Sequence, residues 1–146
     1  MTAVTSRAPS PGSSRPAEPR RHAEIGRSAR TMDALRDVGI EALLTSDRFD
    51  HVDVDTVGAV VEEFVRFVDD VVAPTDRDGD VVGCRVDTDA ATVTTSPGSI
   101  EAYRQYVRPG WGAVPFSMDD GGGGFPKVVG VAMQEVFASG NLGLSL

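Results

Sequence analysis

Four closely spaced aspartates, Asp76, Asp78, Asp80 and Asp87, come nearest to a metal-binding loop in this chain. A calcium loop of the EF-hand type has acidic ligands at positions 1, 3 and 5, glycine at position 6 and glutamate at position 12. Counted from Asp76, position 6 is Val81 and position 12 is Asp87, so the turn glycine and the bidentate glutamate are both missing. We therefore expect a solvated acidic loop here and no metal ligands.

Four glycines at residues 121–124 could present backbone N–H groups to a phosphate at the start of the helix that follows. A dinucleotide-binding pattern would need a further glycine where Pro126 or Lys127 stands, and the Gly-Lys-Ser/Thr end of a Walker loop is missing. We expect instead a flexible connection in which the glycines let the backbone pass close to another element.

Side chains for nucleophilic or acid–base catalysis are scarce. The single cysteine, Cys84, lies among acidic residues, which disfavour the thiolate needed for attack. Together with His22 and His51 it leaves too few ligands for a zinc site or a histidine-based metal centre. The acidic pairs at 62–63 and 69–70 recur seven residues apart, which is typical of a solvated helix face. The residues taken alone predict no catalytic residue.

Length and charge exclude several classes of protein. The 146 residues are 40% hydrophobic and 25% charged, which fits one globular domain with a tail. Residues 31–146 hold twenty acidic and eight basic residues, so this part should repel nucleic acid. No apolar run approaches the roughly 18 residues of a membrane span, so we expect no segment that crosses a membrane. We therefore expect a cytoplasmic protein that does not bind nucleic acid.

Residues 1–30 have a different composition from the rest. They are rich in Pro, Ser and Arg and carry six arginines against two glutamates. Such a segment buries too little apolar surface to offset the entropy of ordering, so we expect a disordered tail. It lacks the apolar stretch of a secretory signal, whereas its arginines and serines leave a transit peptide open as an alternative.

Two apolar patterns with helical spacing occupy the first half of the chain. Residues 31–46 predict a helix with Thr31 as a possible N-cap, and Gly39 weakens its middle. Residues 55–73 predict the clearest helix, capped by Asp55 and ended by Pro74.

The second half predicts two further helices. One lies between Gly98 and Pro109, with Ile100, Tyr103 and Val107 on its buried face. The other is opened by Pro126 and ended by Gly140 and Asn141, where a new element starts. We thus expect an all-α bundle of about four helices with irregular loops at 75–98, including one small hairpin, and at 110–125. The expected core includes Leu43, Phe64, Val68, Tyr103, Val107, Trp111, Met133 and Phe137.

Three segments follow one another in a characteristic order. They are VEEFVRFVDDVVAPTDRDGDVVGCRV, PGSIEAYRQYVRPGWGAVPFSMDDGGGGFP, and a helix with Gln134 and Glu135 that leads into ASGNLGLSL. They contain an APxxxxGD-like turn at 73–80, a Gly-Trp step at 110–111 and the glycine turn. Over residues 33–146 this order resembles the N-terminal helical domain of acyl-CoA dehydrogenases, above all of the long bacterial subgroup.

The resemblance implies an FAD-dependent α,β-dehydrogenation of a fatty acyl-CoA thioester by a homo-oligomer. In that family a glutamate takes the α-proton while the flavin N5 takes a hydride. The base and most flavin contacts belong to a middle β-domain and a C-terminal helical domain, which would lie beyond residue 146 or on a second polypeptide. The resemblance therefore implies that this chain binds no FAD and is inactive alone, that Glu135 is not the base, and that acyl-pocket residues are found at Leu142, Leu144, Ser145 and Leu146.

The domain division expected from this is a tail over 1–30 and a dehydrogenase N-terminal-like helical domain over 31–146. The apolar ending at Leu142, Leu144 and Leu146 predicts that this domain is cut off at its C-terminal end, because natural termini are usually polar. The alternative is a stand-alone, non-catalytic helical interaction module.

Overall fold

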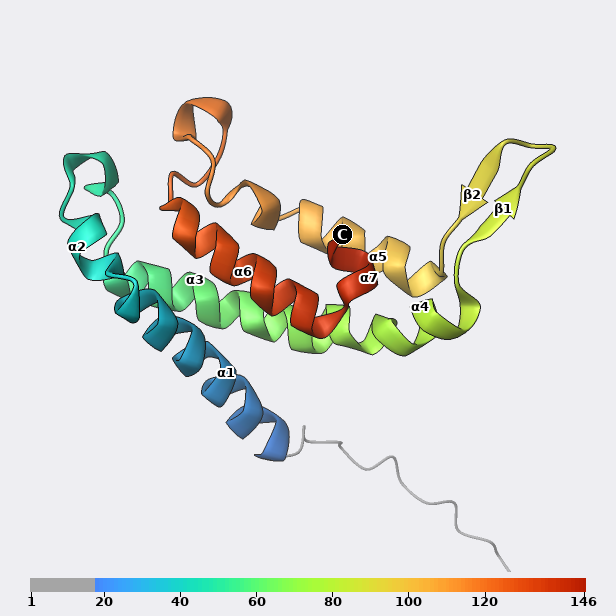
Figure 1. The fold of residues 1–146 in the computed structure, drawn as a ribbon, viewed down its shortest axis with the longest axis horizontal. Coiled ribbons are helices and arrows are strands. Elements are labelled where there is room, and N and C mark those ends of the chain that lie inside the picture. Colours follow the sequence, from blue (N-terminus) through green and yellow to red (C-terminus); the bar gives the residue numbers. More distant parts are fainter. Residues whose placement is uncertain (1–17) are drawn as a thin grey trace, which may run out of the picture.

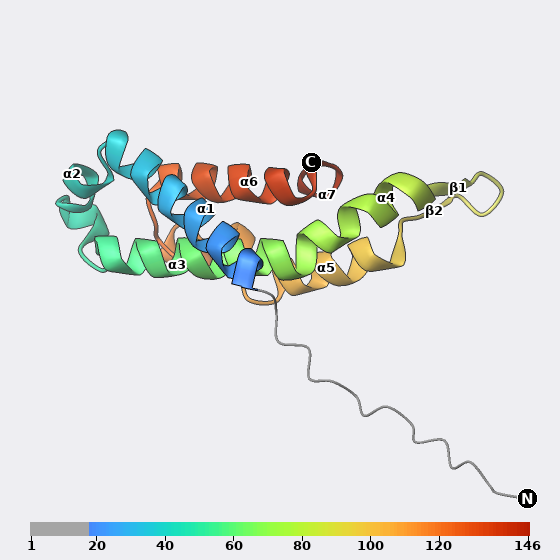
Figure 2. The same ribbon diagram turned by 90° about the horizontal axis from the view of Figure 1, so that it is seen from below.

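Helix α3 (Val54–Phe67) is the element around which the other long helices pack in the computed structural model, which describes residues 18–146. Helix α6 (Lys127–Gly140) runs beside α3, and α1 (Glu18–Asp37) crosses both (Figures 1 and 2). Helix α5 (Pro97–Val107) packs against the continuation of α3. The expectation of an all-α bundle of about four helices is confirmed by these elements.

Shorter elements join the long helices. Helix α2 (Ile40–Leu44) follows α1 after Gly39, whose φ of 84° interrupts the helix predicted over 31–46. Helix α7 (Leu142–Ser145) follows α6. A hairpin of β1 (Arg85–Asp87) and β2 (Thr92–Thr94) lies between α4 (Asp76–Val82) and α5. Short 3₁₀ turns lie at Asp47–Phe49, Ala73–Thr75, Trp111–Ala113 and Met118–Asp120.

The N-terminal part of α1 corrects the prediction of a disordered tail over residues 1–30. Residues 18–30 belong to α1, whereas residues 1–17 lie outside the described part of the chain. Pro and Ser are concentrated before residue 18, and the residues after Pro19 are largely Arg, Glu and Ala, which favour helix. The same helix continues into Met32 and Leu35, which are buried in the core and anchor it. Thr31 is therefore inside a helix and is not its N-cap.

Helix α3 starts and ends differently from the sequence prediction. Its N-cap is Asp53, whose carboxylate accepts a 2.7 Å hydrogen bond from the Thr56 N–H, so the expected cap at Asp55 is wrong. Pro74 does not end the helical path. The α-helix passes into a π-helical turn (Val68–Val72), then a 3₁₀ turn, then α4. A proline ring collides with the carbonyl four residues earlier in a regular α-helix, and irregular turns accommodate it.

Met32 and Leu35 of α1 and valines and aromatic residues of α3 and α6 form much of the core. It contains four residues of the expected set, Phe64, Val68, Met133 and Phe137. Around Phe64 lies an aromatic cluster, with its ring centroid 5.1 Å from Trp111 and 6.2 Å from Phe137. Trp111 is half-buried against the core. This cluster fastens the 3₁₀ turn after α5 to the α3–α6 pair.

Three residues expected in the core, Leu43, Tyr103 and Val107, are instead exposed. Helix α5 turns its small residue Ala102 to the interior, whereas the face of Ile100, Tyr103 and Val107 points to solvent. Both faces have helical spacing, so periodicity could not choose between them. The choice depends on the close approach of α5 to the π-helical turn, which a small side chain permits.

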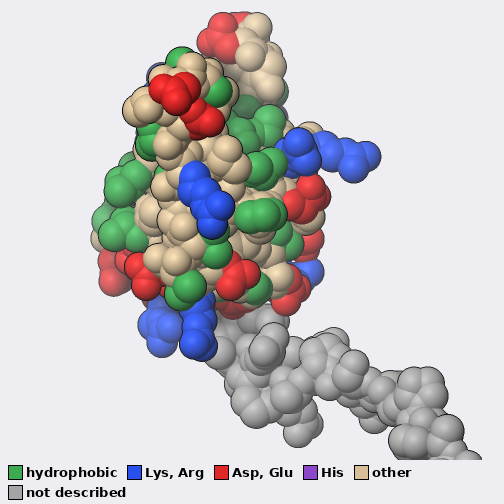
Figure 3. Space-filling model, turned by 90° about the vertical axis from the view of Figure 1, so that its right-hand side faces the viewer, with side chains coloured by type: hydrophobic (Ala, Val, Ile, Leu, Met, Phe, Trp, Pro, Cys, Tyr) green, Lys and Arg blue, Asp and Glu red, His purple; other side chains and the backbone are tan. Residues whose placement is uncertain are grey.

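The hairpin and α4 form one end of an elongated molecule (Figure 1). The hairpin predicted within residues 75–98 is confirmed, with Val86 opposite Val93, whereas α4 replaces the expected loop before it. Seen from this end, hydrophobic side chains reach the surface among acidic and basic ones (Figure 3). Within residues 18–146, no helix has both the length and the hydropathy needed to cross a bilayer.

Candidate functional site

Asn141 positions the segment in which the acyl-pocket residues are predicted. It is buried between α6 and α7, where its side-chain oxygen accepts a 2.9 Å hydrogen bond from the Leu144 N–H. Its amide nitrogen donates a 3.0 Å hydrogen bond to the Thr75 hydroxyl, 66 residues away in sequence. One side chain thus caps α7 and joins it to the turn before α4. The sequence predicted the new start at Asn141, but its partner Thr75 gave no signal.

A cleft of about 340 Å³ lies where α7 meets α4 and the start of α5; we name it the α7 cleft. Leu144 supplies apolar surface to a mainly small and polar lining. The thiol-bearing Cys84 and the hydrogen-bonded pair Ser96 and Ser99 also lie there. The complete lining is Asp76, Gly79, Asp80, Gly83, Cys84, Thr95, Ser96, Ser99, Asn141, Gly143 and Leu144.

The four predicted pocket residues have different surroundings. Leu144 enters the α7 cleft, but Leu142 and Leu146 are exposed to solvent, with 58% and 98% of their surface accessible. Ser145 turns its hydroxyl back onto the Leu142 carbonyl at 2.9 Å, and its own carbonyl accepts a bond from the Gln134 amide at 2.8 Å. Their role in an acyl pocket stays a prediction.

A second concave surface, the α1–α6 groove, has a volume of about 540 Å³ and is mainly aliphatic. Val38 and Val131 on its rims are two-thirds exposed. It is lined by Arg27, Arg30, Thr31, Ala34, Leu35, Val38, Val128, Val131, Ala132, Glu135, Val136 and Ser139. A face this apolar on an exposed surface is typical of a place where another element packs.

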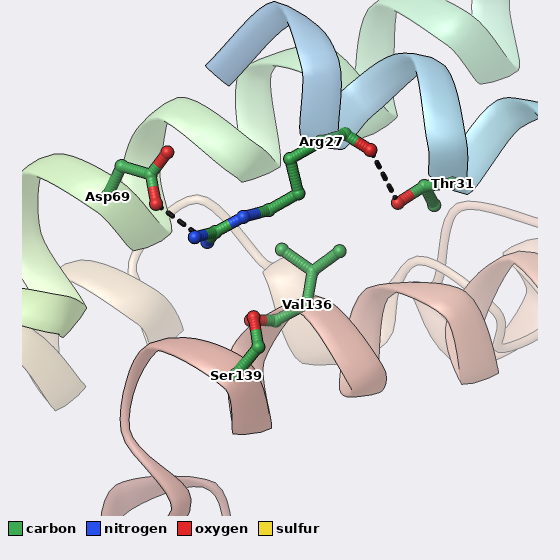
Figure 4. A network of polar contacts seen from close by, with 5 residues as sticks. All are labelled: Arg27, Thr31, Asp69, Val136 and Ser139. Atoms are coloured by element: carbon green, nitrogen blue, oxygen red, sulfur yellow. Dashed lines mark hydrogen bonds and ion pairs between the residues drawn. The ribbon is translucent and has the colours of Figure 1, made fainter. Parts of the chain in front are cut away.

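An ion pair limits this groove at its α3 side. Arg27 of α1 reaches Asp69 in the π-helical turn at 2.7 Å and passes over Val136 of α6 (Figure 4). The Thr31 hydroxyl donates a 3.1 Å bond to the Arg27 carbonyl, and the Ser139 hydroxyl donates a 2.7 Å bond to the Val136 carbonyl. The polar groups of Arg27, Thr31 and Ser139 are thus occupied within the helices, and the aliphatic side chains make up most of the groove lining.

Three of the four aspartates weighed as a calcium loop lie on a helix. Asp76, Asp78 and Asp80 are part of α4 and Asp87 is in β1, so the four carboxylates do not lie on one loop as those of an EF-hand do. Among residues 18–146, no three His, Cys, Asp or Glu side chains gather closely enough to hold a metal ion.

The four glycines form an ordered turn and no phosphate cradle. The N–H groups of Gly122, Gly123 and Gly124 donate to the carbonyls of Ser117, Ala113 and Phe116 at 2.8 to 3.1 Å, so they point into the turn. A Cβ on Gly122 or Gly123 would collide with backbone carbonyls of the same turn. The predicted close approach of backbone is therefore present, but the connection is held by hydrogen bonds.

Among residues 18–146, Asp53 and Tyr106 have displaced pKa values. The pKa of Asp53 is lowered from 3.8 because the side chain and the backbone N–H of Thr56 stabilise its carboxylate. Burial raises the pKa of the Tyr106 phenol, and nearby Tyr103 adds to the effect. Both residues lie outside the α7 cleft and the α1–α6 groove, so they give neither an acid nor a base.

Comparison with known proteins supplies an independent observation. No protein-family profile matches the chain. Over 107 residues, 73% of this chain, it is 35% identical to 3-methylmercaptopropionyl-CoA dehydrogenase of Ruegeria pomeroyi. The aligned residues make up 17% of that protein, so the chain spans about a sixth of its relative. The chain is thus a distant, partial homologue of a protein named as an acyl-CoA dehydrogenase, which supports the resemblance drawn from its segments.

Proposed function

We propose that residues 18–146, which include all of α1, form the N-terminal helical part of an FAD-dependent acyl-CoA dehydrogenase that removes hydrogen from the α and β carbons of a fatty acyl-CoA thioester. The observation that carries this proposal is the 35% identity over 107 residues to an enzyme whose name makes a CoA thioester its substrate. The chain contributes apolar surface to the acyl pocket and packs against the domains that hold the flavin. The assembled enzyme is a cytoplasmic homo-oligomer.

The proposal divides the catalytic and packing roles between this chain and the other domains according to the side chains of the two concave surfaces. The α1–α6 groove has Glu135 on its exposed rim, on a helix face open to solvent. A general base needs a position against the substrate and a pKa matched to its task. We therefore assign the base and most flavin contacts to other domains, and we expect the isolated chain to bind no FAD and to be inactive.

The exposed leucines of α7 and the α1–α6 groove support a packing role. Leu142 and Leu146 leave apolar side chains in water, and Val131 does the same on α6. Covering such side chains contributes about 25 cal/mol for each Å² removed from water. Domains that pack here would gain stability, and Leu144 would then face the acyl chain from the α7 cleft.

A segment exchange tests the proposal. The aligned segment of the Ruegeria enzyme is replaced by residues 18–146 of this chain, which keep α1 whole, and flavin absorbance and acyl-CoA oxidation with an artificial electron acceptor are measured. The chimera should bind flavin and turn over, whereas the enzyme with the segment deleted should do neither. A chimera that folds but behaves like the deletion would overturn the proposal and favour a stand-alone interaction module.

Two matched substitutions in the chimera examine the pocket itself. Leu144→Asp puts a charge into the α7 cleft and should raise KM for the acyl-CoA at least about tenfold, because burial of an unpaired carboxylate is costly. Val93→Asp makes the same type of change on the exposed hairpin and should leave KM unchanged. Equal effects of the two would contradict a pocket role for α7.

A further inference from the structure

A third cavity lies at the opposite end of α6 from α7, between the α2–α3 connection and the glycine turn. We call it the glycine-turn pocket; its volume is about 570 Å³. Arg48, Phe49 and His51 line it from the α2–α3 connection, and Phe116 and Lys127 line it from the other side. Both segments lie at the α2 end of the molecule (Figure 1). Cavities of this size accommodate small organic ligands.

Each of two cations in this pocket lies over an aromatic ring. The guanidinium carbon of Arg48 lies 5.7 Å from the centre of the Phe49 ring, and the Lys127 ammonium lies 5.6 Å from the centre of the Phe116 ring. Within residues 18–146, neither cation forms an ion pair. A ring face holds a cation in place without neutralising its charge, so both cations remain available to an anion.

The charge of the residues that line this pocket is unusual for this chain. Lys127 is the single lysine of the sequence, and residues 31–146 carry twenty acidic side chains. Nevertheless, Asp119 is the one carboxylate among the lining residues, against Arg48 and Lys127. Asp50 lies outside the lining, 3.6 Å from the Nδ1 atom of His51. The local balance thus favours a negative ligand on a molecule that otherwise repels one.

Backbone hydrogen bonds preorganise the walls. The Gly124 N–H donates to the Phe116 carbonyl at 2.8 Å, which fixes the residue that presents the ring beneath Lys127. Gly124 has a φ of 69°, and a Cβ there would lie 2.5 Å from the Nε2 atom of His51. Glycine is therefore required on two counts, and its absence of a side chain lets the imidazole lie against the turn.

We propose that the glycine-turn pocket binds a small phosphate ester with an apolar or aromatic body. Arg48 and Lys127 approach from opposite walls, and two separate cations suit a doubly charged phosphate better than a single carboxylate. The apolar body lies among Phe49, Phe116 and the aliphatic part of the lining. His51, with a side chain 26% accessible, is the third polar group within reach of the ligand. This site does not depend on the dehydrogenase function proposed above.

Phenyl phosphate is the probe, titrated into the full 146-residue chain by calorimetry at constant ionic strength. It should bind more tightly than three reference compounds. Inorganic phosphate lacks the aromatic ring, phenol lacks the phosphate charge, and benzoate carries a single negative charge. The amide NMR signals of His51 and Lys127 and the imidazole signals of His51 should shift on binding. Absence of binding, or equal binding of phenyl phosphate and inorganic phosphate, would overturn the proposal.

Charge-matched variants separate a built site from general attraction. Arg48→Gln with Lys127→Gln should weaken phenyl phosphate at least about tenfold, since both charge-assisted contacts are lost. Arg77→Gln with Arg108→Gln removes the same charge from exposed residues outside the pocket and should leave the Kd unchanged. Asp119→Asn should tighten binding by about two- to fivefold, because it removes the repelling carboxylate. Equal losses in the two double variants would show only surface electrostatics and sink the proposal.

Discussion

The middle of α3 and the end formed by α4 and the hairpin contain the same residue type in opposite surroundings. Val57, Val61 and Val65 of α3 are almost completely buried, whereas valines of α4 and the hairpin are 50% to 76% exposed. The difference lies in the layers available, because α1 and α6 cover α3, but the hairpin projects past the end of α6 (Figure 1). Hydrophobicity alone therefore does not decide burial.

The comparison also bears on stability. Within the described residues, the two-stranded hairpin has no third strand, and such isolated hairpins are marginally stable in water. Its Val86 and Val93 form a cross-strand pair on exposed surface. The packed centre therefore accounts for most of the stability of the chain, and the exposed hairpin contributes little to it.

The strongest test of the comparison is truncation of a large side chain in each region. Phe64→Ala should lower the free energy of unfolding by about 3–5 kcal/mol, because it leaves a cavity among Trp111, Phe137 and the α3 valines. Val86→Ala on the hairpin should change it by no more than about 0.5 kcal/mol. Urea denaturation followed by circular dichroism measures both. Similar losses would refute the contrast between the two regions.

Glycine-to-alanine changes should have opposite signs in two helices. In α6, a Cβ on Gly140 would collide with Val68 of the π-helical turn, so Gly140→Ala should cost about 1–3 kcal/mol. In α3, a Cβ on Gly58 would meet only the Met32 methyl at 3.9 Å, and Gly58→Ala should stabilise by about 0.5–1 kcal/mol. Thermal unfolding of the two variants measures both changes in stability. A gain in stability from Gly140→Ala would show that α6 does not pack this closely against the π-helical turn.

Asn141→Ala examines the joint between the packed centre and the α7 cleft. The variant loses the α7 cap and the bond to the Thr75 hydroxyl, and we expect a loss of about 1–2 kcal/mol. Ser117→Ala, which removes an exposed turn cap at Asp119, is the control and should cost at most about 0.5 kcal/mol. Hydrogen exchange should speed up at the Leu144 amide in the first variant alone. Unchanged exchange there would contradict the role of Asn141.

The smallest effect concerns the start of α3 and depends on pH. Asp53→Asn keeps a hydrogen-bonding cap but removes the carboxylate charge. Because the pKa of Asp53 is lowered in the folded chain, its stabilising contribution is present above the unfolded pKa of about 3.9 and is lost as pH falls through the lower folded value. The Tm difference between the parent and the variant should thus shrink in acid, and a constant difference would contradict the expectation.

Part of the fold could be predicted because its signals are local. The spacing of apolar residues in α3 and α6, the weak point of the predicted helix at Gly39 and the new start at Asn141 depend on neighbours within one helical turn. The candidate site was harder to predict from the sequence. Leu144 was predicted from a family resemblance, and the residues that form its cleft come from α4 and α5, far away in sequence.

The sequence by itself determined the helical class, the approximate positions of α3, α5 and α6 and the acidic surface, since these follow from composition and from periodicity within a helix. Only the tertiary structure decided which face of α5 is buried, that the path passes Pro74 through a π-helical turn, and that Arg48 and Lys127 share a pocket. The reason is physical: these outcomes depend on how closely segments distant in sequence approach, and side-chain volume at the contact sets that approach.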